Sequence, residues 1–424
     1  MRKDFRELLQ ERVVVFDGAT GTRLYDRGIF LNRCFDELNL SSPDLVEEIH
    51  REYVEAGCDV VETNTFGANR LKLDKHGLGD QVVPINEAGA RIARRAAGED
   101  RYVAGAIGPL GIRIEPWGPT SVEEAAEWFA VQAGALARGG VDLFSIETFY
   151  DLAEAEAAVR GIRSVSELPI VVQMTLEDDG TSLEGVSPEV FGSRLATLPI
   201  DVVGVNCSVG PAAMLDAVER IARVVTVPIS AQPNAGKPRV VDNRNLYLCS
   251  PEYMATFARR LIRAGARVVG GCCGTTPDHL RAICRVARSL EPERRAADVA
   301  VEPAGSFEHA REPVPLERRS RFGARLATDR FPISVEMLPP KGHDLARVLE
   351  GAAMLHAAGI DAINIPDGPR ASARMSPVAM AVRIEHEVGI ETLIHYCCRD
   401  RNLLGMQSDL LGAHALGLRN VLLI

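Results

Sequence analysis

The chain of 424 residues is 46% hydrophobic and 25% charged, a composition typical of a globular protein with length for two or three domains. Its net charge of −10 at pH 7 argues against a nucleic-acid partner, because such a protein needs a basic surface to displace counterions.

The first twenty residues mix acidic side chains with only a short apolar run, so they form neither a signal peptide nor a membrane anchor. We therefore predict a cytoplasmic protein with no membrane partner. Without a secretory signal, the nine cysteines are better explained as reduced thiols, core residues or metal ligands than as a disulfide framework.

Eight short apolar runs follow, and each precedes a segment with apolar residues at helical spacing. The runs begin at Val13, Asp59, Tyr102, Asp142, Pro169, Asp201, Val227 and Arg267. Their Val and Ile content is typical of parallel strands covered by helices. Several helical segments end at glycine, namely Gly57, Gly140 and Gly265. Eight such units predict an α/β protein with a (β/α)8 TIM barrel over residues 1–290.

An open, doubly wound sheet is the alternative architecture for the same units. The polar residues favour the barrel, because they fall at the strand ends, which a closed barrel brings together at one rim. In an open sheet they would spread along one edge. The residues are Asp17, Glu62, Asn64, Glu147, Asn206, Cys207, Asn234, Cys272 and Cys273.

Two of these strand ends carry cysteines. Cys207 follows the sixth strand, and Cys272 and Cys273 follow the eighth, so only one strand separates them at the barrel mouth. Three thiolates can meet one ion there, and sulfur ligands favour zinc over magnesium or calcium. Three protein ligands leave a fourth, exchangeable position, as in catalytic zinc sites. Such an electron-rich site is a poor Lewis acid for hydrolysis, but it can activate a thiol as a nucleophile.

Asn234 ends the strand between the two cysteine-bearing strands. We expect its amide oxygen to be the fourth zinc ligand when no substrate is bound. Two other interpretations of the adjacent pair Cys272 and Cys273 are a strained vicinal disulfide and ordinary core packing. The matching position of Cys207 and the glycines around the pair favour the metal site.

Residues 291–330 are rich in Arg, Glu, Ala and Pro without sustained periodicity, and we interpret them as a linker. A second set of strand and helix patterns follows, with strands near Ile333, Asp361, Thr392 and Asn420. Four strands cannot close a barrel of this kind. The region 331–424 therefore predicts the first half of a second (β/α)8 barrel.

The motifs of residues 10–290 resemble those of the zinc-dependent homocysteine S-methyltransferases. They are DGATGT from Asp17, ETNTF from Glu62, ETF from Glu147, GVNCS from Gly204 and GGCCGTTPDH from Gly270. The resemblance implies that Cys207, Cys272 and Cys273 bind Zn²⁺ and that the sulfur of homocysteine joins as the fourth ligand. The resulting thiolate then takes a methyl group by in-line displacement, giving methionine.

The resemblance also implies where the amino acid lies. Backbone amides of Gly18, Ala19 and Thr20 reach the substrate carboxylate, while Asp17 and Glu147 face its ammonium group. We add Asn206 to the expected substrate contacts. For Glu62 and Asn64, substrate contact and hydrogen bonding within the barrel mouth remain equally open.

Residues 331–424 resemble 5,10-methylenetetrahydrofolate reductase, a flavin-dependent barrel. SVEMLPPK from Ser334 corresponds to its opening strand, and HYCCRDRN from His395 corresponds to the end of its third strand. The resemblance implies that Glu336 protonates the folate, that His395 contacts FAD, and that folate and NAD(P)H are substrates. Pro366 stands where those reductases usually carry a hydroxyl residue.

The two resemblances together predict a homocysteine S-methyltransferase linked to a methylenetetrahydrofolate-reductase-like domain. The methyl donor stays open: S-methylmethionine, a betaine-like onium, S-adenosylmethionine and a methylated corrinoid protein all suit a zinc thiolate. A methylated folate has a poorer leaving group, a neutral amine, and would need strong activation or a cobalamin intermediary. The alternative function is a zinc-binding barrel that serves the flavin domain as scaffold or sensor without methyl transfer.

Overall fold

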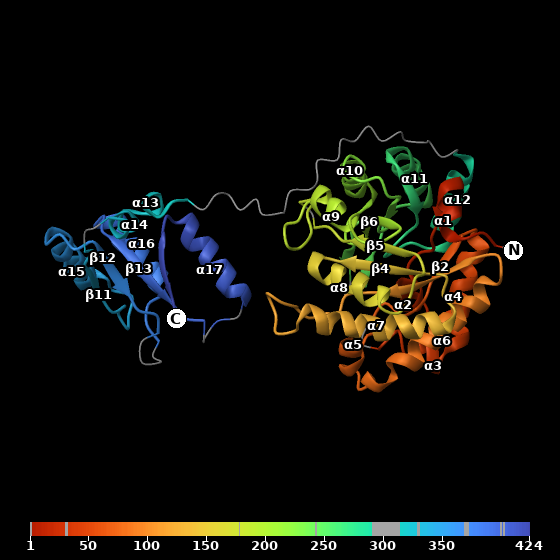
Figure 1. Ribbon diagram of the computed structural model, residues 1–424, viewed down its shortest axis with the longest axis horizontal. Coiled ribbons are helices and arrows are strands. Elements are labelled where there is room, and N and C mark those ends of the chain that lie inside the picture. The colour runs from red at the N-terminus through yellow and green to blue at the C-terminus, as the bar shows by residue number, and fades with distance from the viewer. Residues whose placement is uncertain are drawn as a thin grey trace. The chain divides into compact units, whose positions relative to one another are not determined.

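The computed structural model describes residues 2–29, 33–177, 179–241, 244–290, 314–328, 331–368, 373–398, 401 and 403–424. The chain forms two compact units, Met1–Gly305 and Ser306–Ile424. Figure 1 shows the first unit as strands surrounded by helices and the second as a smaller sheet with helices beside it. Within the described ranges, no helix is long and apolar enough to cross a membrane.

The first unit contains an eight-stranded parallel sheet in the order β1-β10-β7-β6-β5-β4-β3-β2. The sheet closes because Phe16, beside β1, forms a parallel bridge to Val60 of β2. The predicted (β/α)8 barrel is therefore confirmed, and the open sheet is wrong. The strands are β1 (Val14–Val15), β2 (Val60–Glu62), β3 (Tyr102–Ile107), β4 (Leu143–Phe149), β5 (Ile170–Met174), β6 (Val202–Asn206), β7 (Ile229–Gln232) and β10 (Ala266–Val269).

Helices surround this ring and connect its strands (Figure 1). Three of them end at the expected glycines, each in the left-handed region: Gly57, Gly140 and Gly265. The helical elements are α1 (Phe5–Glu11), α2 (Thr20–Asp26), α3 (Leu38–Ser41), α4 (Pro43–Ala56), α5 (Arg70–Asp74), η1 (Gly79–Gln81), α6 (Val82–Ala97), α7 (Val122–Gly139), α8 (Leu152–Arg163), α9 (Pro188–Leu195), α10 (Pro211–Ile221), α11 (Pro251–Ala264) and α12 (Pro277–Ser289).

Helix α1 closes the end of the barrel at which the strands begin. Its apolar residues Phe5, Leu8 and Leu9 are buried in one cluster with strand residues that include Phe16 and Tyr102. The ring of Phe5 meets the rings of Phe16 and Tyr102 edge-on, at centroid distances of 6.3 and 5.8 Å. This plug leaves the opposite end of the barrel, where the strands finish, for the functional site.

Three aspartates at the starts of β2, β4 and β6 each tie their strand to the strand that precedes it in the chain: Asp59, Asp142 and Asp201. Their carboxylates accept the backbone N–H groups of Val15, Val103 and Ile170 at 2.9, 2.7 and 2.8 Å. Each carboxylate also pairs with an arginine close to the N-terminus, namely Arg12, Arg2 and Arg6. We call these three groups the carboxylate clamps. Because they couple the N-terminal segment to the strand starts, they fix the strand register at the closed end.

The second unit contains a four-stranded parallel sheet in the order β11-β12-β13-β14. This is the strand arrangement of half a (β/α)8 barrel, as predicted. The strands are β11 (Ser334–Glu336), β12 (Ala362–Ile365), β13 (Glu391–Tyr396) and β14 (Asn420–Leu423), and the helices are α13 (Leu316–Arg319), α14 (Arg321–Leu326), α15 (Ala346–Ala357), α16 (Pro377–Glu387) and α17 (Leu403–Ala415).

Part of the expected linker is folded. Residues 314–328 form α13 and α14, whereas residues 291–313 lie outside the described residues. Ser320 caps α14 and also bonds to Asn420 at 2.6 Å, and Arg325 pairs with Asp361 at 3.2 Å. Residues 314–328, which we interpreted as part of the linker, thus contain two short helices. Two helices this short carry too little periodicity to be read from sequence, and contacts with the second sheet hold them.

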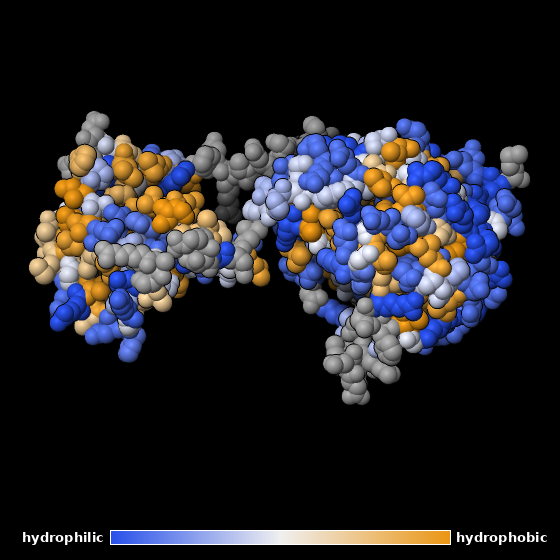
Figure 2. All heavy atoms as spheres, turned by 90° about the horizontal axis from the view of Figure 1, so that it is seen from below, coloured by the Kyte–Doolittle hydropathy of each residue, from blue (hydrophilic) through white to orange (hydrophobic). Residues whose placement is uncertain are grey.

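Many apolar side chains of the second unit are exposed, as the orange areas of Figure 2 show. The solvent-exposed fraction is between 71% and 77% for Met354, Leu404, Leu411 and Leu423. Strand β14 has exposed residues along most of its length and only one neighbouring strand. Among the described residues, the second unit thus buries a smaller core than the first.

The buried histidine His50 makes the stability of the first unit depend on pH. It lies in α4, and neither ring nitrogen has a hydrogen-bond partner. Burial lowers the pKa of His50 from 6.5 to about 4. Between these pH values the unfolded chain binds a proton that the folded chain does not. The free energy of unfolding therefore falls by roughly 3 kcal/mol as pH falls from 6.5 to 4.

We expect His50→Leu to remove this component of the pH dependence, because leucine neither titrates nor needs a partner. The measurement is urea unfolding of the first unit at several pH values between 7.5 and 4.5. The exposed His76, in the same unit, provides the control, since His76→Leu should leave the dependence of stability on pH unchanged. If the free energy of unfolding of His50→Leu changes with pH as in the wild type, His50 is not the source of the pH dependence.

Candidate metal and substrate site

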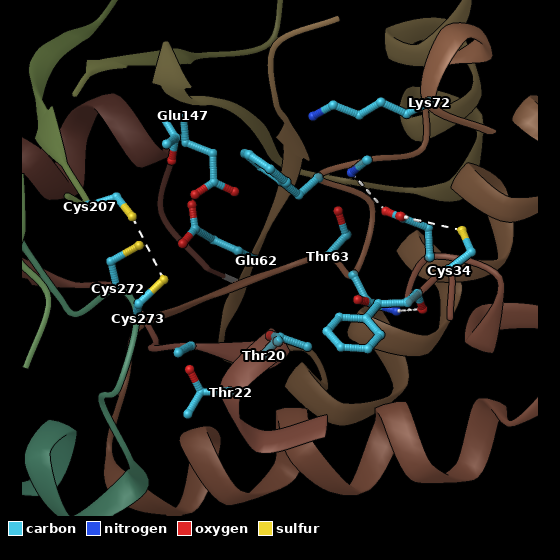
Figure 3. Close-up of a pocket in the computed structure, with 18 of the residues that line it drawn as sticks. Thr20, Thr22, Cys34, Glu62, Thr63, Lys72, Glu147, Cys207, Cys272 and Cys273 are labelled. Carbon is cyan, nitrogen blue, oxygen red and sulfur yellow. Dashed lines mark hydrogen bonds between the residues drawn. The ribbon is translucent and has the colours of Figure 1, made fainter. Parts of the chain in front are cut away.

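A cavity of about 530 Å³ opens where the barrel strands end (Figure 3). Its wall combines the loop after β1, the ends of β2, β4, β6 and β10, and two outer segments around Phe35 and Lys72. The lining residues are Gly18, Ala19, Thr20, Gly21, Thr22, Arg33, Cys34, Phe35, Asp36, Glu62, Thr63, Asn64, Phe66, Gly67, Lys72, Lys75, His76, Glu147, Thr148, Cys207, Gly271, Cys272 and Cys273.

Three thiols meet at one side of this cavity. The sulfur atoms of Cys207, Cys272 and Cys273 all lie within 4.8 Å of one another, and those of Cys207 and Cys273 are 3.7 Å apart. Two sulfurs bound to one tetrahedral zinc ion at about 2.3 Å are about 3.8 Å apart. The three cysteines are free thiols rather than a vicinal disulfide. The donor set and its spacing therefore fit zinc.

The backbone that presents Cys207 is strained. Cys207 and Ser208 adopt φ angles of 61° and 52°, and Thr148, which is hydrogen-bonded to Asn206, adopts 61°. Residues other than glycine seldom adopt this left-handed backbone conformation outside functional sites. Hydrogen bonds hold the conformation: Asn206 accepts the backbone N–H of Thr148 at 2.7 Å and donates to its hydroxyl at 2.8 Å. The strain turns the Cys207 side chain toward the cysteine pair of β10.

The thiol cluster by itself favours a single negative charge. Hydrogen bonds from Cys207, Cys272 and the Tyr247 hydroxyl lower the pKa of Cys273 to about 3. The pKa of Cys272 is raised well above its usual value, first by its hydrogen bonds to Cys207 and Cys273 and then by burial. A divalent cation stabilises all three as thiolates, because it offsets their mutual repulsion.

Buried carboxyl groups form the next part of the wall. Glu62 and Glu147 point toward each other in Figure 3, beside the thiols. Gln232 donates to Glu62 at 3.0 Å, and Asn206 donates to Glu147 at 3.3 Å. Burial raises the pKa of both, well above the usual value for Glu147, where the charge of Glu62 adds to it. A cationic group entering the cavity would restore their negative charge.

Asp17 lies outside the cavity lining. Its carboxylate accepts the backbone N–H of Glu62 at 3.1 Å, while its other oxygen has no partner. Burial raises its pKa well above the usual value. Of the two acids expected to face an ammonium group, Glu147 lines the cavity together with Glu62, and Asp17 lies directly behind Glu62. The expected role of Asp17 stays a prediction.

The loop after β1 packs tightly against the cysteine loop. A Cβ on Gly18 would lie 2.6 Å from the hydroxyl oxygen of Thr275, so only glycine fits there. Thr275 also accepts the N–H of Ala19 at 3.3 Å, and Thr22 accepts the N–H of Gly274 at 3.1 Å. The two sequence motifs DGATGT and GGCCGTTPDH thus form one continuous wall.

The two remaining asparagines, Asn64 and Asn234, differ in their hydrogen bonds. Asn64 donates to the carbonyl of Phe35 at 2.7 Å, which is the mouth hydrogen bond left open as its alternative role. Asn234 is buried and lies outside the cavity lining, yet its side-chain oxygen has no hydrogen-bond partner. An unpartnered oxygen beside the cysteine loop is compatible with the expected fourth ligand, and that role stays a prediction.

Two cavity residues, Lys72 and Asp36, were not predicted from the sequence. Lys72 lies across the cavity from the thiols, and its ammonium group is 4.5 Å from the centre of the Phe66 ring. Burial lowers the pKa of Lys72. Asp36 accepts the N–H of Gly67 at 2.8 Å. Lys72 lies in the five-residue helix α5 and Asp36 in an irregular segment before α3, so no periodicity marked them.

The expected residues of the second unit lie on two strands of its parallel sheet. Glu336 ends β11 and is exposed, and His395 is half-buried in β13. Strand β12 separates them. At the end of β12, Asp367 accepts the N–H of Cys397 at 3.0 Å and pairs with Arg401. The strand order places Glu336 and His395 at the same edge of the sheet.

Known proteins share this arrangement. The family described as Homocysteine S-methyltransferase matches residues 14–287, which is more than half of the chain. The chain belongs to the homocysteine S-methyltransferase family. It is thus an enzyme of the methyltransferase class. The family described as Methylenetetrahydrofolate reductase matches residues 321–424 and so includes helix α14, in agreement with the folded start of the second unit.

Curated relatives include the methionine synthases of Mycobacterium leprae and Mycobacterium tuberculosis. They are 36% and 35% identical to this homocysteine S-methyltransferase family member, over 66% and 72% of its chain. The chain spans only 25% and 27% of their length. Among solved structures, the metallated homocysteine methyltransferase MmuM of Escherichia coli is 23% identical, with a TM-score of 0.57. It covers 66% of this chain and 98% of its own, and it supports the fold.

The thiol geometry predicts which cysteines retain metal. We expect Cys207→Ser and Cys273→Ser to lower bound zinc from about one ion per chain to less than a tenth, because a neutral hydroxyl is a poor substitute for a thiolate. Metal analysis after dialysis measures this. Cys34→Ser is the matched control, since Cys34 lines the same cavity outside the cluster. Full zinc in Cys273→Ser would falsify the ligand set.

Proposed function

We propose that the first unit catalyses zinc-dependent transfer of a methyl group to the thiol of homocysteine, giving methionine. The cluster of Cys207, Cys272 and Cys273 beside two buried carboxyl groups supports this proposal most directly. The three thiolates would hold the ion, and Asn234 would supply a weak oxygen ligand until substrate arrives. The cytoplasmic location proposed from the sequence suits this site, because its thiols must stay reduced.

The residues around the cluster orient the amino acid. Bound zinc supplies one function here, which is to lower the pKa of a thiol that joins it. Glu147 and Glu62 would take the substrate ammonium group, and their buried carboxyl groups would ionise as it enters. The loop Gly18, Ala19 and Thr20 would meet the carboxylate with backbone amides. Asn206 acts indirectly, since it holds Glu147 and Thr148 in place.

The remainder of the cavity would receive the methyl donor. Its outer wall carries Lys72, Lys75 and Arg33, which favours a donor with an anionic group. S-methylmethionine and betaine-like donors carry a carboxylate in addition to their onium centre, and methylated folates and corrinoids carry carboxylate or phosphate groups. The position of Lys72 across the cavity from the thiols supports its contact with the donor rather than with homocysteine (Figure 3).

We further propose that the second unit belongs to a flavin-dependent methylenetetrahydrofolate reductase, with FAD as cofactor and folate and NAD(P)H as substrates. Glu336 would donate a proton to the folate, and His395 would contact the flavin. Their location at one edge of the sheet supports these roles. The bifunctional pairing would place a methyl-forming reaction and a methyl-using reaction in one protein.

A panel of donors tests the main proposal. We expect the zinc-loaded protein to form methionine from homocysteine with at least one of S-methylmethionine, betaine, S-adenosylmethionine, methylcobalamin or methyltetrahydrofolate. Product formation, followed by chromatography, should cease when a chelator removes zinc and return when zinc is restored. Stoichiometric zinc without methionine from any donor would favour the alternative of a scaffold or sensor for the second unit.

The donor that succeeds in that panel then tests Lys72. We expect Lys72→Met to raise the KM for the donor about tenfold, the loss of about 1.4 kcal/mol, and to leave the KM for homocysteine unchanged. Lys75→Met is the matched control, because Lys75 lines the same cavity but is more exposed. A larger change in the homocysteine KM than in the donor KM contradicts the assignment.

A further inference from the structure

A row of polar side chains runs through the barrel interior to Glu62. The hydroxyl of Ser230 donates to the side-chain oxygen of Gln173 at 2.8 Å. The side-chain nitrogen of Gln173 donates to the side-chain oxygen of Gln232 at 2.6 Å, and the nitrogen of Gln232 donates to Oε2 of Glu62 at 3.0 Å. We call Ser230, Gln173 and Gln232 the polar row. Its residues lie on β5 and β7 and are at most 2% exposed.

Such a row is unusual in this place. Branched apolar side chains normally fill the interior of a (β/α)8 barrel, and burying amides and hydroxyls costs free energy unless each is hydrogen-bonded. Two glycines leave room for the row. A Cβ on Gly204 would lie 2.7 Å from Cβ of Ser230, and one on Gly270 would lie 3.1 Å from Cγ of Gln232. The barrel wall is thus built around these polar side chains.

The ionised form of Glu62 sets the direction of every hydrogen bond in the row. A carboxylate only accepts hydrogen bonds, so Gln232 must present its amide nitrogen to it. The amide oxygen of Gln232 then faces Gln173, which must present its own nitrogen. The remaining oxygen of Gln173 accepts the hydroxyl of Ser230. Because each amide has one orientation, the row holds Oε2 of Glu62 at a fixed point.

The other carboxylate oxygen of Glu62 is left for a ligand. Oε1 is buried and has no hydrogen-bond partner, and Asp17 contacts Glu62 at its backbone N–H. Glu62 lines the cavity and points toward Glu147 (Figure 3). A buried acceptor without a partner is costly to maintain, and an N–H donor arriving from the cavity would satisfy it.

We propose that Gln232 is a positioning residue for Glu62, and that Gln173 and Ser230 hold Gln232 in turn. This inference rests on the proposed function, in which the ammonium group of homocysteine lies at Glu62 and Glu147. Because the polar row occupies Oε2, Oε1 of Glu62 is the atom that receives the ammonium group. The hydrogen bond from Gln232 also stabilises the negative charge that Glu62 acquires there. Recognition of the amino group therefore depends on side chains that do not line the cavity.

Gln232→Met tests the row, because methionine is similar in size and has no amide. The measurement is calorimetric binding of two thiols to the zinc-loaded full chain: homocysteine, and 4-mercaptobutanoate, which lacks only the amino group. We expect Gln232→Met to bind homocysteine about tenfold more weakly than the wild type, because a hydrogen bond to a charged group is lost. 4-Mercaptobutanoate should bind both proteins with affinities within about twofold, since it carries no ammonium group.

Two further variants separate positioning from folding. Ser230→Ala removes only the far end of the row, so we expect homocysteine to bind about threefold more weakly, with no further loss in the Gln232→Met background. It carries the test if Gln232→Met does not fold. Gln132→Met is the matched control. Gln132 is also fully buried, but it donates to the carbonyl of Thr65 at 2.9 Å, so any effect should be the same for both thiols.

A selective loss of homocysteine binding is the result expected from positioning. If Gln232→Met, or Ser230→Ala in its place, weakens the binding of both thiols equally or of neither, the proposal is overturned. The row would then support the fold alone. Failure of the zinc-loaded wild type to bind homocysteine overturns the proposed function itself, so the two failures are distinguishable.

Discussion

Closure of the parallel sheet is the constraint on which the candidate site depends. In a closed ring of parallel strands, every strand ends at the same rim, so residues separated by long stretches of chain become neighbours there. Cys207 and Cys273 are brought to 3.7 Å in this way, although 66 positions separate them. The bridge between Phe16 and Val60 that completes the ring also places the loop after β1 against the cysteine loop. An open sheet would instead spread these parts of the site along one edge.

The site is arranged at some energetic cost. Asp17, Glu62 and Glu147 are buried near one another, and Cys207, Ser208 and Thr148 have strained backbones. Such features are tolerated where the surrounding structure is overdetermined. Here a dense set of hydrogen bonds from Asn206, Gln232 and Thr275 supplies that support. Ligands that carry positive charge, such as a metal ion and an ammonium group, would offset the free-energy cost of burying these carboxyl groups.

Much of the fold could be read from the sequence, because buried parallel strands leave continuous Val-rich and Ile-rich runs. The three thiols could be assigned to one cluster by counting strands, since Cys207 follows the sixth apolar run and Cys272 and Cys273 follow the eighth. Lys72 and Asp36 could not be found in that way. Lys72 lies in the five-residue helix α5 and Asp36 in an irregular segment before α3, and neither follows the end of an apolar run. Helices α13 and α14 were missed because tertiary contacts, not periodicity, maintain them.

The carboxylate clamps separate two demands that a barrel must meet. Asp59, Asp142 and Asp201 hold the strands at the end remote from the cavity, and each joins one even-numbered strand to the strand before it. Asp361 repeats the arrangement in the second unit, where it accepts the N–H of Ile333 at 2.9 Å. Strand alignment is thus set pair by pair at one end of the sheet. The loops at the other end are free to diverge in length and chemistry without shifting the strands, so one scaffold can support a thiol-based site in one unit and a different chemistry in the next.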